Sequence, residues 1–229
     1  MVFIMVKYIL LDLDGTVFDF NKGERSAFIK TIVENCNYKP SLEECLEFSR
    51  INEFYFKEYQ NKKMTREEFH FNRFRSIMEY MNISYNIFDI NKYYVNELKY
   101  QADLYDDALD IIKYIKNKYI LCAQSNGMEL VQRKRLEEAG IISYFDKIYI
   151  SELIGYNKPD KRFFDFIIND IGDYDLDNYL IIGDRLDSDI LGGINSDINS
   201  IYVKREDNKE KGDSLQKQVN SLSSLKKII

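Results

Sequence analysis

The sequence has few of the residues on which several kinds of functional site depend. It contains one histidine, His70, and three cysteines among 229 residues. One histidine excludes a multi-histidine metal site, and a Ser-His-Asp triad would have to use His70. We expect this residue to lie on the surface or in a helix cap. The cysteines lack metal-ligand spacing and an even-numbered disulfide framework, so we expect reduced, mostly buried thiols in a cytoplasmic protein: Cys36, Cys45 and Cys122.

Prolines, glycines and long apolar runs are scarce as well. With 2 prolines and 10 glycines, the chain is neither collagen-like nor of low complexity. The sequence has no stretch of about 20 apolar residues, which is the length a membrane-spanning helix needs. Its apolar start lacks the basic region and cleavage site of a signal peptide. A net charge of −6 argues against a nucleic-acid polymer or an anionic membrane as partner. The length fits one large domain or one domain with an insertion. The sequence indicates no oligomeric state, and a monomer stays open.

The chain does contain an ordered alternation of apolar and helical segments. Residues 6–11 form a short apolar run that ends in a glycine turn, as buried parallel strands do. Residues 21–100 have a helical pattern, which predicts about four helices. After residue 100 the alternation predicts a parallel sheet with helices on both faces. The predicted strands are residues 119–123, 147–150, 179–183 and 199–203, the predicted helices are residues 106–117, 128–139, 159–169 and a stretch from about 188, and residues 204–213 form a predicted charged surface loop.

The helical block between residues 21 and 100 has clear helix signals. Segments beginning at Ser41 and Thr65 have the sequence of a capping box, with Glu44 and Glu68 three residues further on. Because the first strand cannot bury itself alone, it must join the later sheet, and the helical block is an insertion. Apolar residues recur at i, i+3, i+4 and i+7, as on a core-facing helix surface. These stripes are Ile29, Ile32, Val33 and Cys36, then Phe74, Ile77, Met78 and Met81, with Tyr94, Val95 and Leu98 in a weaker fourth helix.

Four acidic residues follow two of the predicted strands, at the sheet edge where α/β proteins bind ligands. Asp12 and Asp14 follow the first strand, and Asp184 and Asp189 follow strand 179–183. A single acid at such a place is usually a helix cap or a turn residue. Four together are unfavourable unless protons or a cation offset their charge. A hard cation that prefers oxygen ligands, Mg²⁺ first, is the simplest solution.

Groups that attract anions are predicted at the same edge. Ser125-Asn126-Gly127 follows strand 119–123 and opens a helix, whose free N–H groups favour negative charge. Lys158 adds a positive charge, and Pro159 restricts its backbone to extended conformations. Each of these residues alone would be an ordinary cap or surface side chain. Together with a metal they indicate a site for a phosphoryl group.

Four segments of the chain carry a resemblance to a known family. They are Asp12-Leu13-Asp14-Gly15-Thr16, Ser125-Asn126-Gly127, Lys158-Pro159-Asp160 and the segment from Gly183 to Asp189. In this order they resemble the four motifs of the haloacid dehalogenase-like (HAD) hydrolase superfamily, and the helical insertion resembles its type-one cap. More narrowly, LDLDGTVFDF, IGYNKPDKRFF and GDRLDSDILGGIN are similar to bacterial pyrimidine 5′-nucleotidases, with departures at Arg185 and at Asn195-Ser196-Asp197.

The resemblance implies a fold and an activity. The fold is α/β, with a Rossmann-like parallel sheet core from residues 1–17 and 101–229 and an inserted all-helical cap domain over residues 18–100. The implied activity is that of a Mg²⁺-dependent phosphatase, a phosphomonoester hydrolase that forms a phosphoaspartyl intermediate. The substrate class is a small-molecule phosphate ester, with a nucleoside 5′-monophosphate expected.

The resemblance also implies roles for individual residues. Asp12 is the implied nucleophile, Asp14 the general acid and base, and Ser125 and Lys158 the groups that hold the transferring phosphoryl group. The implied metal ligands are Asp12, the Asp14 backbone carbonyl, Asp184 and Asp189, the last directly or through water. The implied substrate-binding residues are Gly15, Thr16, Asn126 and Gly127.

Other functions remain open at this point. The same scaffold serves sugar-phosphate phosphatases and phosphomutases, because the motifs recognise only the phosphoryl group. A receiver-like module that accepts phosphate also uses acids, a lysine and Mg²⁺, but it lacks Asp14-Gly15-Thr16 and a large insertion. A catalytically inactive binder is a further alternative. Phe18-Asp19-Phe20 follows the first motif and is the best candidate for a hinge or a wall of the substrate site.

Overall fold

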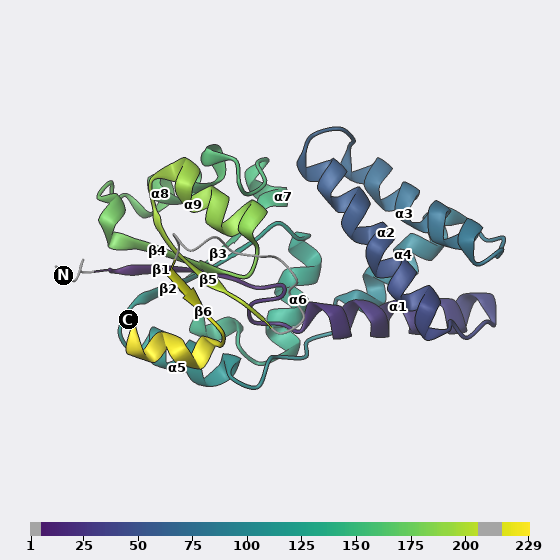
Figure 1. Ribbon diagram of the computed structural model, residues 1–229, viewed down its shortest axis with the longest axis horizontal. Coiled ribbons are helices and arrows are strands. Elements are labelled where there is room, and N and C mark those ends of the chain that lie inside the picture. Colours follow the sequence, from purple (N-terminus) through teal and green to yellow (C-terminus); the bar gives the residue numbers. More distant parts are fainter. Residues whose placement is uncertain (1–5, 206–216) are drawn as a thin grey trace. The chain divides into compact units, whose positions relative to one another are not determined.

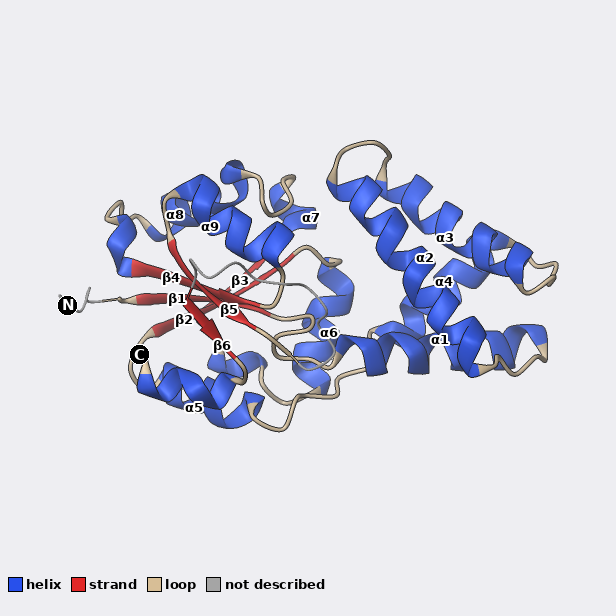
Figure 2. Ribbon diagram, in the orientation of Figure 1, coloured by secondary structure: helices blue, strands red, loops and turns tan. Residues whose placement is uncertain are grey.

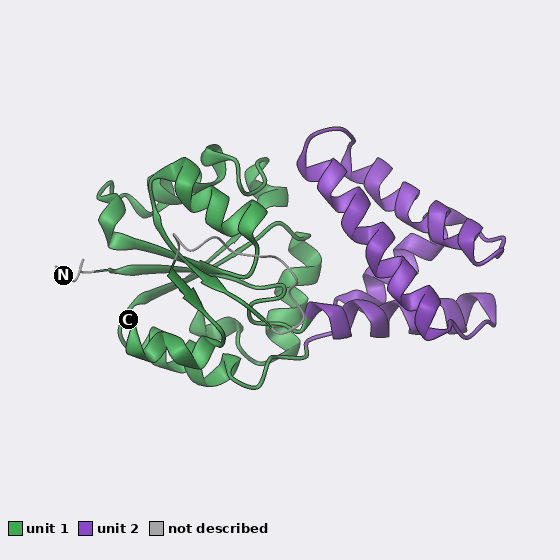
Figure 3. Ribbon diagram, viewed as in Figure 1, with its two compact units in different colours: residues 1–19, 103–229 green, residues 20–102 purple. Residues whose placement is uncertain are grey.

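A computed structural model describes residues 6–205 and 217–229 of the chain. The chain divides into two compact units, Met1–Asp19 with Asp103–Ile229 and Phe20–Ala102, which Figure 3 distinguishes by colour. We call them the sheet unit and the helical unit and describe each by itself. Most of the charged loop predicted at residues 204–213 lies outside the described residues.

A parallel sheet forms the centre of the sheet unit (Figure 1). Its strand order is β3-β2-β1-β4-β5-β6, and every neighbouring pair is parallel. Because β1 lies in the middle, the residue at its carboxyl end is flanked by the ends of β2 and β4. The strands are β1 (Tyr8–Asp12), β2 (Ile120–Ser125), β3 (Lys147–Ile150), β4 (Tyr179–Gly183), β5 (Asn199–Val203) and β6 (Lys217–Val219).

The five strands predicted from apolar runs are confirmed. Three of them have the predicted bounds. The first begins two residues later and ends one residue later than predicted, and the second begins one residue later and ends two residues later. The sixth strand, β6, was not predicted because it has only three residues, two of which are exposed lysine and glutamine. A strand so short and polar carries no apolar pattern in the sequence.

Helices cover both faces of the sheet, as Figure 2 shows. On one face α8 contributes Phe163, Phe164 and Ile167 to a buried cluster that includes Leu10 of β1 and Ile181 of β4. Asp160 caps α8, so this helix begins two residues after the predicted position. The helices are α5 (Ala108–Lys116), α6 (Glu129–Glu138), α7 (Ser151–Ile154), α8 (Lys161–Ile171) and α9 (Leu191–Ser196), with a π-helical turn at Leu186–Ile190 before α9 and a 3-10 helix at Leu222–Lys227.

The helical unit consists of four helices, as predicted, and the first begins one residue before the predicted block. Both predicted capping boxes are present, because the Ser41 and Thr65 hydroxyls accept from the backbone N–H groups of Glu44 and Glu68, and both glutamates accept in return. The predicted stripe from Phe74 to Met81 is buried. The helices are α1 (Phe20–Cys36), α2 (Leu42–Gln60), α3 (Arg66–Tyr80) and α4 (Ile87–Leu98).

The buried face predicted for α1 is wrong by about one residue position. Val33 is 41% exposed, whereas Glu24, Ala27 and Phe28 are buried. Two contacts explain why a different face of α1 is buried. Phe28 stacks on Phe48 of α2, with ring centroids 4.2 Å apart, and the Glu24 carboxylate accepts hydrogen bonds from α2. A buried glutamate on the core face cannot be found from an apolar pattern.

The cysteines lie where the sequence predicts, but His70 does not. All three cysteines are free thiols, and Cys45 and Cys122 are buried, as expected. His70 lies in the middle of α3 and is only partly exposed, its ring 5.0 Å from that of Phe69, so it is neither a surface nor a capping residue. Among the residues that the structure describes, we find no helix with the length and apolarity needed to span a bilayer.

Candidate active site

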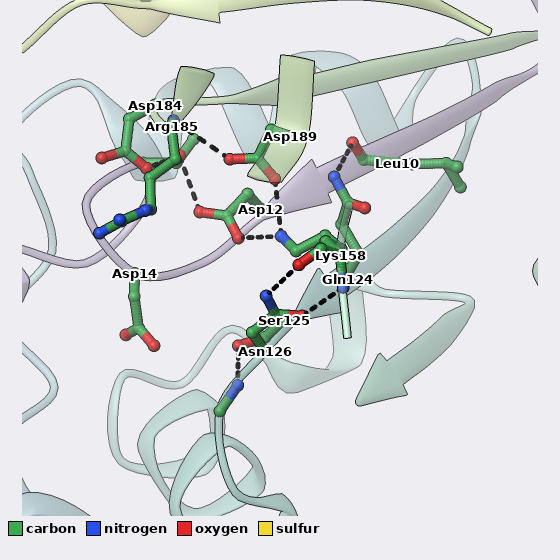
Figure 4. A network of polar contacts seen from close by, with 12 residues as sticks. Leu10, Asp12, Asp14, Gln124, Ser125, Asn126, Lys158, Asp184, Arg185 and Asp189 are labelled. Carbon is green, nitrogen blue, oxygen red and sulfur yellow. Dashed lines mark hydrogen bonds and ion pairs between the residues drawn. The ribbon is translucent and has the colours of Figure 1, made fainter. Parts of the chain in front are cut away.

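The ends of three neighbouring strands bring the predicted site residues together (Figure 4). β1 ends at Asp12 and β2 at Ser125, while Asp184 follows the last residue of β4. Parallel strands that end at one edge place these side chains side by side. Lys158 precedes α8 and Asp189 lies in the π-helical turn after β4, and both reach the same point.

Lys158 is the centre of the site. Its Nζ donates to Asp12 Oδ1 at 2.7 Å and to Asp189 Oδ1 at 2.6 Å. The lysine side chain is 2% exposed. Burial alone would lower the pKa of Lys158, but the two carboxylates outweigh burial and raise it. The ammonium is therefore charged at neutral pH.

Thr16 joins two of the acids on the other side. Its hydroxyl lies 3.0 Å from Asp12 Oδ2 and 2.9 Å from Asp184 Oδ1, and it is fully buried. The turn that brings Thr16 there needs Gly15, whose φ is +84°, and a Cβ at Gly15 would collide with the Asp184 carboxyl. The motif's glycine is thus required by backbone conformation and by space.

The acids of the site carry more charge than their partners neutralise. Oxygens of Asp12, Asp184 and Asp189 all lie within 4.8 Å of one another. Burial, then the charge of Asp189, raises the pKa of Asp12 to about 7 even though Lys158 opposes the shift. Burial, then Asp12, holds the pKa of Asp184 well above its usual range. When all three acids are ionised, they exceed the charge of the Lys158 ammonium by two negative charges, which one divalent cation would balance.

These residues fit a magnesium ion. All donors are carboxylate oxygens, the ligands that this hard cation prefers. The cluster is buried, and burial with the neighbouring acids raises the pKa values of Asp12 and Asp184, so ionising both is unfavourable without further positive charge. The Asp14 carboxylate lies outside this cluster.

The motif after β2 holds the other side of the site. Asn126 uses both ends of its amide on the Lys158 backbone: Nδ2 donates to the Lys158 carbonyl at 2.9 Å, and Oδ1 accepts from the Lys158 N–H at 2.8 Å. The Ser125 hydroxyl accepts from the Gly127 N–H at 3.0 Å and from Gln132 Nε2 at 2.8 Å. With two donors already directed at its oxygen, the Ser125 hydroxyl has its own proton left to donate.

The Asp14 carboxylate turns away from the other acids and toward α6. It accepts one hydrogen bond from Gln132 Nε2 and one from Arg135 NH1, and its side chain is 27% exposed. The Arg135 side chain is 1% exposed. Asp14 is thus both held by the protein and open to solvent on one side.

Sequence reasoning missed Gln132 and Arg135. The signal was weak, because α6 buries Val131, Gln132, Arg135 and Leu136 together, and two polar residues on the core face hide its amphipathic pattern. The available clue was position: both residues lie within the first turns of the helix that Ser125-Asn126-Gly127 opens. A buried arginine so near a motif needs an acid partner.

Phe18 does not form a wall of a substrate site. It is fully buried, and the Arg135 guanidinium lies 4.3 Å from its ring centroid. Its backbone carbonyl accepts from the Gly15 N–H at 2.9 Å, which closes the loop after β1. Phe18 therefore anchors the end of the Asp14 loop.

A family comparison agrees with this geometry. The model of the haloacid dehalogenase-like hydrolases matches residues 6–197. The chain belongs to this family. It is accordingly a hydrolase, and the matched region includes every site residue described above.

Three proteins are similar to this chain over most of its length. Pyrimidine 5′-nucleotidase YjjG from Escherichia coli is 27% identical, over 97% of this chain and 97% of its own length. Pyrimidine 5′-nucleotidase PynA from Streptococcus pneumoniae is 29% identical, over 86% of this chain and 83% of its own. The crystal structure of the HAD-hydrolase YfnB from Bacillus subtilis, bound to magnesium, has a TM-score of 0.89 and 26% identity, and the match covers 97% of this chain and 98% of that one.

Proposed function

We propose that this HAD hydrolase is a Mg²⁺-dependent phosphatase that acts on small phosphate monoesters, with nucleoside 5′-monophosphates as the preferred class. The observation that supports it most strongly is the convergence of Asp12, Asp184 and Asp189 with Lys158 at one sheet edge, beside Ser125 and Asp14. An excess of buried acids suits a metal, and the hydroxyl and ammonium suit the oxygens of a phosphoryl group.

In the first step an Asp12 carboxylate oxygen attacks phosphorus. The new P–O bond forms as the ester P–O bond breaks, and Asp14 delivers a proton to the departing alcohol oxygen. Lys158 keeps Asp12 in place through its 2.7 Å bond and adds positive charge next to the attacked group. The Ser125 hydroxyl donates to a phosphoryl oxygen.

In the second step water releases the phosphate. Asp14, now ionised, accepts a proton from water, whose oxygen attacks the phosphorus of the phosphoaspartyl group. The bond between phosphorus and Asp12 breaks and restores the carboxylate. A single carboxyl group thus acts first as acid and then as base, which requires that Asp14 point at both the leaving oxygen and the incoming water.

Mg²⁺ would be held by the carboxylates of Asp12 and Asp184, by the Asp14 carbonyl and by Asp189, directly or through water. When bound, it supplies positive charge that offsets the charge of the phosphoryl oxygens and of the acids. Gly15 and Gly127 support the turns that carry these groups, because their N–H groups donate to the Phe18 carbonyl and to the Ser125 hydroxyl. We propose that the backbone N–H of Thr16 contributes to binding the phosphoryl group.

Nucleotides are proposed as the substrate class on the basis of similarity. Two relatives that align over most of the chain are pyrimidine 5′-nucleotidases. The residues around the phosphoryl site select no leaving group, so selection falls to other residues. We propose that the sheet unit is the catalytic core and the helical unit is the cap that selects the leaving group.

The test is a panel of phosphate esters assayed with and without Mg²⁺ under one set of conditions. The panel contains UMP, dTMP, AMP, several hexose phosphates and p-nitrophenyl phosphate. We expect metal-dependent release of phosphate, with the highest kcat/KM for a pyrimidine nucleotide. A hexose phosphate more than about tenfold ahead of every nucleotide would favour a sugar-phosphate phosphatase. Stable phosphorylation without turnover would favour a receiver-like module.

A further inference from the structure

Two residues of α6 contact the Asp14 carboxylate from inside the protein. Arg135 NH1 donates to Oδ1, and Gln132 Nε2 donates to Oδ2, so each oxygen has one donor. The same Gln132 Nε2 lies 2.8 Å from the Ser125 hydroxyl oxygen, and Gln132 Oε1 accepts from Arg135 NH1 at 3.4 Å. The amide therefore links the Asp14 carboxylate to the Ser125 hydroxyl in a fixed orientation.

Arg135 also holds the far end of the Asp14 loop. Its guanidinium lies 4.3 Å from the ring centroid of Phe18, a cation–π contact inside the sheet unit. Asp14 and Phe18 bridge each other along the backbone, and the Gly15 N–H donates to the Phe18 carbonyl. One buried side chain thus contacts both the carboxylate at the start of the loop and the aromatic ring at its end.

We propose that Gln132 and Arg135 are positioning residues for the acid and base Asp14. They set the direction of its carboxylate relative to Ser125, so that one carboxyl group serves both the leaving oxygen and the attacking water. Neither residue touches the reacting atoms. This inference rests on the proposed phosphatase function, in which Asp14 transfers the proton.

The energetic reason for such a device is the exposure of Asp14. A carboxylate 27% exposed on a loop has several rotamers in water, and proton transfer needs one of them. Arg135 is rigid by contrast, because it is fully buried and contacts three groups. Fixing the carboxylate from its buried side leaves its other side to substrate and water.

The test compares two esters that differ in their need for a proton. The leaving group of p-nitrophenyl phosphate departs readily as an anion, whereas that of benzyl phosphate is an alkoxide that needs protonation. The parameter is kcat/KM, which reports the steps up to departure of the leaving group. In Arg135→Met we expect kcat/KM to fall about a hundredfold for benzyl phosphate and to stay nearly unchanged for p-nitrophenyl phosphate. Gln132→Met should also lower kcat/KM more for benzyl phosphate than for p-nitrophenyl phosphate, but with less selectivity, because it removes a donor to Ser125, which both esters use.

A matched control lies on the same helix. Arg133→Met removes an arginine whose ion pair with Glu129 is on the surface of α6, and both esters should keep their wild-type kcat/KM. Arg135→Lys keeps a positive charge near Asp14 and should recover part of the loss on benzyl phosphate. Asp14→Asn sets the full leaving-group effect, and adding Arg135→Met to it should cost nothing further, because Arg135 acts through Asp14.

Each other outcome has a definite meaning. Equal losses of kcat/KM on both esters, or an additive loss in the Asp14→Asn/Arg135→Met double variant, would overturn the positioning role and leave the phosphatase function intact. If Arg135→Met does not fold, Gln132→Met and Arg135→Lys carry the same comparison. A wild-type protein that releases phosphate with Mg²⁺ neither from these two esters nor from any nucleotide of the panel would overturn the proposed function, and the inference with it.

Discussion

The two units each bury a polar cluster, and the clusters differ in their balance of charge. In the sheet unit, three carboxylates share one ammonium, that of Lys158. In the helical unit, one carboxylate and one guanidinium, Glu24 and Arg73, are joined through Asn52, which donates to Glu24 at 2.7 Å and accepts from Arg73 at 2.9 Å. The first cluster has more acids than bases, and the second has one of each.

The neighbours of each cluster show the same contrast. Arg73 also donates to Asn91 at 2.8 Å and lies 4.7 Å from the Tyr94 ring centroid, so four helices are tied together by neutral or compensated groups. Burial still raises the pKa of Glu24, although hydrogen bonds from Ser49 and Asn52 and the charge of Arg73 oppose it. Both clusters are buried and polar. The two clusters differ in charge: three acids face one lysine in the sheet unit, whereas Glu24 and Arg73 balance each other in the helical unit.

The largest expected effect concerns the unbalanced cluster. Asp12→Asn should reduce phosphate release to the background rate, because an amide oxygen cannot form the phosphoaspartyl bond. The fold should persist, since the variant removes one of three mutually repelling carboxylates. Steady-state assays and circular dichroism measure the two properties. Asp165→Asn, which breaks a surface pair with Lys161, is the control and should keep full activity. Wild-type turnover in Asp12→Asn would contradict the mechanism.

In the balanced cluster the expected effect is on stability. Arg73→Met should lower the free energy of unfolding by about 3–5 kcal/mol, because it leaves the Glu24 carboxyl buried without its charge partner. Urea unfolding followed by fluorescence or circular dichroism measures the change. Arg75→Met in the same helix is the matched control, since Arg75 is half exposed and lies 4.0 Å from Glu79, and it should cost under about 1 kcal/mol. Similar losses in both variants would remove the distinction between them.

A smaller effect is expected when Mg²⁺ binds the acids of the sheet unit and stabilises the folded protein. Mg²⁺ at one hundred times its Kd should raise the free energy of unfolding by about 2.7 kcal/mol, if it binds only the folded state. Thermal melts with and without Mg²⁺ measure the shift. Asp184→Ala should abolish the stabilisation, while Asp170→Ala, which removes an exposed acid paired with Lys147, should retain it. An unchanged Tm of the wild-type protein at saturating Mg²⁺ would count against the metal site.

The same contrast explains how much the sequence could predict. The sheet, the capping boxes and the convergence of Asp12, Ser125 and Asp184 followed from apolar runs and strand ends, because periodicity and topology are local or general properties. The face of α1 was predicted wrongly because Glu24 is buried there. Gln132 and Arg135 escaped for the same reason. Hydropathy assigns polar residues to the surface, and only a three-dimensional partner shows that one is buried.

The sequence also could not distinguish roles among the motif residues. Asn126 follows Ser125 in a motif that binds phosphate by resemblance, yet its side chain holds the Lys158 backbone. Phe18 was a candidate wall and is a buried anchor instead. Both outcomes depend on which groups meet across 32 and 117 residues of sequence, from Asn126 to Lys158 and from Phe18 to Arg135. No local pattern records such meetings.

The smallest expected effect comes from protonation of His70, which adds a positive charge near Arg73. Burial, then the charges of Arg73 and Arg66, lowers the pKa of His70 to about 3 from a usual 6.5. The unfolded chain therefore takes up a proton below about pH 6.5, and the folded chain does so only near pH 3. Acidification through this window favours unfolding, and the stability supplied by the neutral imidazole, fully present above pH 6.5, is progressively lost.

His70→Gln removes this titration and leaves the other ionisable groups in place. Between pH 6.5 and 5.5 the wild-type protein should lose about 1 kcal/mol more unfolding free energy than the variant, since one proton of difference corresponds to at most about 1.4 kcal/mol per pH unit. Urea unfolding at both pH values measures the difference, and the carboxylates of the sheet unit cancel because both proteins contain them. Parallel losses in the two proteins would show that His70 protonates in the folded state as it does in the unfolded chain. In that case Glu24 would neutralise Arg73 well enough for a protonated His70 to be accommodated near it.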